Sequence, residues 1–343
     1  MSRLLEGVLK GVGRLADGVV QVSAPAAVSW LTVPAAWMPL TPLRDDVWFA
    51  ETVDVPSHTV LPVALDATAV AERLVGGAGP RGQLVSWERR WAPSGLAPTS
   101  MLRARPHVVL RHWEVPRPKA QLLLVSGFNM GWGFLDALVL RVRWFLARGY
   151  SVTLLGLPLH GSEAVVAGPP PWPSVDLELT RDAVALATHD VRSGVAWLRA
   201  QHAAPVVVLG VSLGAWPAAL AATVPGAPDV FAALTPMVDY PRLLLDHRPP
   251  WVARGAITRL AASLEPVSPL ARPPVVAPGR VQVFAAAEDH VTPPGHHAAP
   301  LATHFGTDVM VFPGSHLVPR GLETAWASLD ALVDSLDETR SAR

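Results

Sequence analysis

A serine flanked by two glycines is the strongest chemical signal in the chain. Gly210 and Gly214 each stand two residues from Ser212, in the pattern G-x-S-x-G. An apolar run, 206–209, precedes the pattern and an alanine-rich segment, 215–223, follows it, so a strand must turn sharply into a helix at the serine. Larger side chains at the two glycine positions would collide in such a turn. The pattern predicts a nucleophile elbow, in which amides at the start of the helix can stabilise an oxyanion.

A serine alcohol is a weak nucleophile, so it needs a base and a carboxylate that orients the base. The last two strand-like runs of the chain are each followed by a suitable residue, Asp289 after the first and His316 after the second. Parallel strands end at the same edge of a sheet, so we expect both side chains near Ser212. Enzymes built on a nucleophile elbow use this chain order of serine, acid and histidine.

Other residues in this part of the chain could supply the acid or bind a metal. Asp239 follows the apolar run 230–234 and is a competitor for the carboxylate, whereas Glu288 adjoins Asp289 but points in a different direction. Several histidines also crowd this region, but they lack a ligand spacing with carboxylates. We therefore expect no metal. These histidines are His290, His296, His297 and His304.

Two further segments make residues 105–343 resemble the α/β-hydrolase superfamily. Segment 122–128, LLLVSGF, is similar to the strand and oxyanion loop of that family. Segment 157–162, LPLHGS, is similar to a turn that is usually structural in the family, so His160 is not expected to be catalytic. The resemblance implies a mostly parallel sheet covered by helices on both faces.

The resemblance also implies an oxyanion hole. In that alignment its donors are the backbone N–H groups of Phe128 and Leu213. Ser126 stands where the family usually has histidine, so Asn129 stays open as an alternative donor.

By the same resemblance the chain is a serine hydrolase, similar to carboxylesterases and lipases, that needs no cofactor. Ser212 would attack an acyl carbonyl, His316 would take and return the proton, and Asp289 would orient His316. Two alternatives stay open. The same triad would support acyl transfer to an alcohol, and the fold could serve as a catalytically silent binding module.

Composition limits the partners. The 28 basic residues balance 28 acidic ones, so nothing indicates binding to nucleic acid, which needs clustered positive charge. Half of the residues are hydrophobic and 16% are charged, which excludes intrinsic disorder. Cysteine is absent, which excludes thiolate nucleophiles and zinc–thiolate sites. We expect a small-molecule ester as substrate, and the oligomeric state is not indicated.

Apolar side chains near the predicted site favour a hydrophobic acyl group, although large aromatic residues are as often in the core. The candidates for the mouth of the site are Phe128, Met130, Trp132, Trp216, Met237, Trp251 and the proline-rich segment 168–173.

Strand-like and helix-like segments alternate along the chain, which predicts an α/β fold. The predicted strands are 83–91, 107–114, 121–125, 151–155, 206–209, 230–234, 281–285 and 308–311. The predicted helices are 134–148, 177–201, 213–223 and 322–336. Segment 240–279 interrupts the alternation, and we expect a small helical cap insertion there.

Residues 1–104 are predicted to be an N-terminal extension before a hydrolase domain at 105–343. The extension would contain an amphipathic helix over 4–20, a proline- and tryptophan-rich segment and the first strand. The charge-free stretch 18–43 is broken by prolines, which disfavours a membrane span, and no signal peptide is evident. We expect a cytoplasmic protein, with peripheral membrane contact left open only through residues 1–48.

Overall fold

The computed structural model describes residues 53–61, 82–89, 100–131, 134–161, 164, 170–174, 176–248 and 254–341. The helix predicted over 4–20 and the segment 1–48 considered for membrane contact lie outside the described residues. Trp132 and Trp251 lie outside them as well. None of the helices in the described part of the chain has the length and apolar character that crossing a membrane requires.

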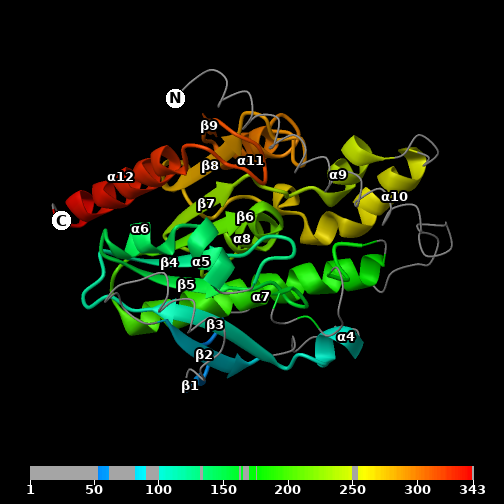
Figure 1. Ribbon diagram of the computed structural model, residues 1–343. Helices are drawn as coiled ribbons and strands as arrows, with labels where there is room; N and C mark the ends of the chain where they lie inside the picture. The colour runs from blue at the N-terminus through cyan, green and yellow to red at the C-terminus, as the bar shows by residue number, and fades with distance from the viewer. Residues whose placement is uncertain are drawn as a thin grey trace.

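One sheet of nine strands forms the centre of the described structure (Figure 1), in the order β1-β2-β3-β5-β4-β6-β7-β8-β9. The strands are β1 His58–Leu61, β2 Gln83–Glu88, β3 His107–Trp113, β4 Ala120–Val125, β5 Tyr150–Leu155, β6 Val206–Val211, β7 Val230–Leu234, β8 Val281–Ala286 and β9 Val309–Phe312. From β5 to β9 all neighbours are parallel, whereas β1, β2 and β3 pair antiparallel, as do β3 and β5. The predicted mostly parallel sheet is confirmed, with an antiparallel edge.

Helices cover both faces of this sheet (Figure 1). They are α4 Ser100–Arg103, α5 Phe134–Val139, α6 Val142–Leu146, α7 Leu177–Gln201, α8 Ala215–Ala221, α9 Tyr240–His247, α10 Arg254–Leu264, α11 Ala298–Phe305 and α12 Leu322–Ser341. Because both faces are covered, every residue of β4, β6 and β7 is buried. This explains why their sequences are nearly continuous apolar runs, interrupted by the buried Gln121 on β4, rather than alternating ones.

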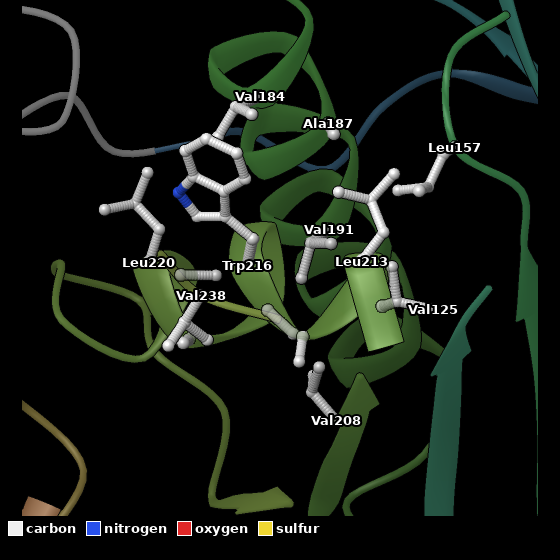
Figure 2. Packing of buried hydrophobic residues seen from close by; sticks show 14 of the residues in the cluster. Val125, Leu157, Val184, Ala187, Val191, Val208, Leu213, Trp216, Leu220 and Val238 are labelled. Atoms are coloured by element: carbon white, nitrogen blue, oxygen red, sulfur yellow. The ribbon is translucent and has the colours of Figure 1, made fainter. Parts of the chain in front are cut away.

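The two faces of the sheet pack into two separate hydrophobic clusters. On β4, Leu123 and Val125 pack with α7 and α8, whereas Leu122 and Leu124 pack on the side of α6 and α12. This division follows from the alternation of side chains along a strand. Figure 2 shows part of the first cluster, in which Leu213 packs near Val191 and Trp216. The residue after Ser212 is therefore anchored in the core.

Several predicted elements need correction. The helix predicted over 134–148 is two helices, because Arg141 adopts a left-handed backbone conformation with φ of 56° between α5 and α6. Arg141 also forms an ion pair with Glu323 at the start of α12. The helix predicted over 213–223 begins instead as a 3-10 turn, Ser212–Gly214, before α8. β1, α4 and α11 were not predicted.

Segment 240–279 contains α9 and α10 and is fastened to the body of the molecule. Leu244 on α9 and Leu260 on α10 belong to the same hydrophobic cluster as α7 and α8. The indole Nε1 of Trp216 on α8 donates a hydrogen bond to the carbonyl of Val267, at 2.6 Å.

The N-terminal strands belong to the same sheet as the rest of the described structure, because β2 pairs with β3. The division of the chain at residues 104 and 105, and the role of 240–279 as a cap, stay predictions.

Candidate active site

Ser212 stands at a sharp turn where β6 ends. Its φ of 51° is in the left-handed region, which is uncommon for a residue other than glycine. A Cβ atom on Gly210 would lie 2.5 Å from the Cα atom of Ala215. A Cβ atom on Gly214 would lie 2.4 Å from the carbonyl oxygen of Ser126. Both contacts are prohibitive, so glycine at these two positions is what allows the turn.

Three strand ends bring Ser212, His316 and Asp289 together. His316 Nε2 lies 2.9 Å from Ser212 Oγ, and His316 Nδ1 lies 2.9 Å from Asp289 Oδ2. An ionised carboxylate can only accept hydrogen bonds, so Nδ1 is the donor and Nε2 of the neutral imidazole is left to accept from the serine hydroxyl. The histidine side chain is 7% exposed and that of the aspartate 1%. The arrangement can transfer a proton from the serine to the imidazole.

Asp289 is held by its own loop. Its Oδ1 accepts from the backbone N–H groups of Val291, at 2.9 Å, and Thr292, at 2.8 Å. The hydroxyl of Thr292 donates to Oδ2 at 2.9 Å and lies 3.1 Å from His316 Nδ1. The Thr292 oxygen is also 3.3 Å from the carbonyl of Thr235. Thr292 was not predicted as a site residue, although a threonine three residues after an aspartate is a familiar local turn partner.

The competing carboxylates have other partners. Asp239 is the N-cap of α9, where its Oδ1 accepts from the N–H of Arg242 at 2.8 Å. Burial raises the pKa of Asp239 above its ordinary value. Glu288 forms an ion pair with Arg320 at 3.0 Å. The geometry therefore favours Asp289 as the carboxylate beside the histidine.

The loop that follows β4 passes directly beside Ser212. A Cβ atom on Gly127 would lie 3.2 Å from the Cβ atom of Ser212. The loop and the turn come close together at Gly127 and Ser212. The two predicted oxyanion donors are the next residues in the chain, Phe128 after the glycine and Leu213 after the serine. Asn129, the alternative donor, has a φ of 54°. The roles of these backbone groups stay predictions.

His160 takes a packing position. Its ring is edge-on to Phe128, at 5.5 Å between centroids, and to Trp172, at 4.9 Å. Its Nδ1 lies 3.0 Å from the carbonyl of Pro158. Burial lowers the pKa of His160 to about 4, so the ring is neutral near pH 7. It supports the loop that carries Phe128.

Two of the other histidines approach one carboxylate. His296 Nδ1 and His297 Nε2 lie 2.9 Å and 3.8 Å from Asp246 Oδ2, and burial lowers the pKa of His297 to about 4. His290 is exposed, and His304 lies beside Phe305. Within the described residues, no group of three or more His, Cys, Asp or Glu side chains has the geometry to hold a metal ion.

Two candidates for the mouth of the site belong to the core instead. Trp216 is 1% exposed within the cluster of α7 and α8. Met237 is 3% exposed, and its N–H donates to the carbonyl of Ser212 at 2.9 Å. Phe128 is 46% exposed, and so is the unpredicted Leu317 at 48%. Phe128 follows Gly127, which lies close to Ser212, and Leu317 follows His316.

Comparisons with known proteins establish the fold. No family model and no curated protein matches the sequence. Acetyl xylan esterase 1 from Thermoanaerobacterium sp. JW/SL YS485 has a TM-score of 0.52 and 14% identity, over 84% of this chain and 93% of that one. An acetyl xylan esterase from Paenibacillus sp. R4 has a TM-score of 0.50 and 12% identity, over 92% and 93%. The chain has the α/β-hydrolase fold, and at these identities the likeness extends no further.

Proposed function

We propose that the protein is a serine hydrolase that cleaves a carboxylic ester through an acyl-enzyme intermediate. The observation that carries this proposal is the pair of 2.9 Å hydrogen bonds joining Ser212 to His316 and His316 to Asp289. A serine, a histidine and an aspartate that met by chance on a protein surface would not be expected to form this series of two hydrogen bonds. The two structures of the same fold are named as esterases, which agrees with this chemistry.

In the proposed reaction Ser212 Oγ attacks the acyl carbonyl carbon while its proton passes to His316 Nε2. The backbone N–H groups of Phe128 and Leu213 stabilise the negative oxygen of the tetrahedral intermediate. The bond to the alcohol then breaks, and the alcohol leaves with the proton from His316. A water molecule repeats the sequence on the acyl-enzyme and releases the acid. Throughout, Asp289 orients the imidazole and stabilises its positive charge.

The substrate is proposed to be hydrophobic beside the ester. Single exposed apolar side chains are ordinary on protein surfaces. Phe128 and Leu317 differ because one follows the glycine that touches Ser212 and the other follows His316, and they are 46% and 48% exposed. Apolar side chains at that place would be covered by a bound acyl or alcohol group.

A series of p-nitrophenyl esters, from acetate to long-chain acyl groups, tests this function and the acyl preference together. We expect turnover that rises with acyl length. Turnover that is equal to that of the Ser212→Ala variant for every ester would refute the proposal.

The two alternatives give different results in the same assay. Acyl transfer would produce a new ester when a candidate alcohol is added, whereas hydrolysis yields only free acid. A silent binding module would show no turnover and no reaction of Ser212 with a fluorophosphonate. No observation on the described residues favours either alternative over hydrolysis.

A further inference from the structure

We propose that Asp136 is a positioning residue that fastens the oxyanion loop, defined here as residues 126–131, and so sets the rate of the reaction without touching the substrate. The proposal rests on the proposed function, because the loop has a catalytic role only if Ser212 attacks an acyl group. Asp136 lies in the first turn of α5, outside the triad, and it is 3% exposed.

One oxygen of Asp136 connects both ends of the loop. Its Oδ2 accepts from the backbone N–H of Gly131 at 2.7 Å and from the hydroxyl of Ser126 at 3.3 Å. Ser126 is the first residue after β4 and is fully buried. Hydrogen bonds to an ionised carboxylate are roughly twice as strong as neutral ones. The buried carboxylate therefore closes the loop across its base.

Two hydrogen bonds within the loop are long or have a weak acceptor. The N–H of Gly127 donates to the sulfur of Met130 at 3.2 Å, and the N–H of Met130 donates to the carbonyl of Gly127 at 3.2 Å. Sulfur is a weak acceptor. Asn129 is also left-handed, with a φ of 54°, which costs free energy that surrounding contacts must offset. Contacts from outside the loop therefore contribute to holding this conformation.

The loop is confined between two other segments. On one side Gly127 approaches Ser212, where a Cβ atom would lie 3.2 Å from the serine Cβ. On the other side a Cβ atom on Gly161 would lie 2.4 Å from the carbonyl oxygen of Met130. With both sides in contact, the bonds to Asp136 limit movement of the loop along its length, together with the hydrogen bond from the N–H of Ser126 to the carbonyl of Leu155 at 3.0 Å. A shift along that direction moves the N–H of Phe128 relative to Ser212.

A purely structural role for Asp136 gives a different expectation. A carboxylate in the first turn stabilises a helix through the helix dipole. Its loss would then lower the stability of the protein and leave the chemical step unchanged. A positioning role lowers kcat while KM stays constant, because the affected interaction exists only in the transition state.

The test measures kcat and KM for a p-nitrophenyl ester with the Asp136→Asn enzyme, together with its affinity for an alkyl boronic acid that forms a tetrahedral adduct on the serine. We expect kcat to fall at least about tenfold, and by no more than the roughly 10²–10³-fold loss that follows complete removal of an oxyanion donor. KM stays within about twofold, and the boronic acid binds more weakly in parallel with kcat.

Asp229→Asn is the matched control. Asp229 accepts the N–H of Val206 at 2.9 Å, so it also bonds to the backbone, but at the end of β6 away from Ser212. We expect Asp229→Asn to lower Tm and to leave kcat unchanged. An equal loss of kcat in both variants would overturn the proposal, because it would be an effect of lost stability.

Ser126→Ala provides a second variant that keeps the helix carboxylate, and it decides the matter if Asp136→Asn does not fold. We expect a smaller loss of kcat, and a double variant that loses less than the product of the two single losses. If kcat stays within about twofold of that of the unaltered enzyme in both Asp136→Asn and Ser126→Ala, the role of Asp136 is overturned while the proposed function stands. Failure of the unaltered enzyme to react with a fluorophosphonate would overturn the proposed function, and this proposal with it.

Discussion

Thr292 places one hydroxyl group against both the carboxylate and the imidazole of the proposed triad. It lies 2.9 Å from Asp289 Oδ2 and 3.1 Å from His316 Nδ1. We expect Thr292→Val to lower kcat/KM about tenfold, because one hydrogen bond to a charged group contributes roughly 1.5–3 kcal/mol. Thr292→Ser keeps the hydroxyl and is expected to restore most of the activity. Equal losses in the two variants would show that shape, rather than the hydroxyl, is what matters.

Phe128 is expected to set the acyl preference. We predict that Phe128→Ala lowers kcat/KM for long-chain esters by about 10–100-fold more than for the acetate ester, since a lost apolar contact costs ~1–3 kcal/mol. The ratio of kcat/KM values for the two esters is the measurement. Leu138→Ala is the control, because Leu138 is 55% exposed on α5 and should leave the ratio unchanged. A similar change of the ratio in both variants would argue against a specific contact.

The site residues that could be predicted are those that stand in a strong local sequence pattern. Ser212, Asp289 and His316 could be named because each follows a strand-like run and one is flanked by two glycines. The structure brings these three together, whereas their catalytic roles stay predictions. Asp136 and Thr292 were not named, although Thr292 bonds to an aspartate only three residues away. Its contact with His316 depends on how the chain folds back in space, and the bonds of Asp136 depend on the conformation of the loop before it.

The turn after β6 is the element on which the site depends most. We expect Gly214→Ala to destabilise the protein by about 1–3 kcal/mol, the usual cost of an overpacked core, and to abolish activity. Its Cβ atom would lie 2.4 Å from the carbonyl oxygens of Val125 and Ser126. Urea unfolding measures the change. In Gly279→Ala the new Cβ meets nothing within 4 Å, so its stability should stay within about 0.5 kcal/mol. Equal stability of the two variants would contradict the packing described for the turn.

Element boundaries were predicted well where the apolar pattern is continuous. The predicted bounds 177–201 and 230–234 agree with α7 and β7. The break between α5 and α6 was missed, because the pattern of apolar residues continues through Arg141 and its left-handed backbone leaves no trace in that pattern. β1 and α4 are four residues long each, too short for a clear period.

Three buried histidines make the stability of the folded protein depend on pH. Burial lowers the pKa values of His112, His160 and His297 from an ordinary 6.5 to about 4. The unfolded chain therefore binds more protons than the folded one between those values. The stability from these groups is complete above pH 6.5 and is lost as the pH falls towards 4, by up to about 3 kcal/mol for each histidine.

Two buried carboxylates have the opposite effect on the stability as the pH falls. Burial raises the pKa values of Asp182 and Asp190 to about 6, so the folded state gains protons as the pH falls below 6 and the loss is partly offset. We still expect the free energy of unfolding, measured in urea, to decrease from pH 7 to pH 4.5. His112→Asn should make this decrease smaller. A free energy of unfolding that is constant over this range would contradict the burial of these rings.

The architecture of the whole molecule was the most predictable level. Alternating apolar strands and helices indicated a parallel sheet covered on both faces, and the order of the nine described strands agrees with that. The antiparallel pairing of β2 with β3 could not be read from the pattern, because the order of apolar residues along a strand does not record the direction of the neighbouring strand. Residues 1–52 lie outside the described structure, so the predictions for them are untested.

Covalent labelling of Ser212 is the most direct test of the central claim. This claim is that His316 and Asp289, each placed after a strand end, activate Ser212 as a nucleophile. The protein is treated with a fluorophosphonate and analysed by intact mass and peptide mapping, with Ser212→Ala and the heat-unfolded protein as controls. We predict one adduct per chain, on Ser212, with loss of ester turnover in step with labelling and no adduct in either control. An unlabelled folded protein, or full ester turnover in Ser212→Ala, would contradict the account.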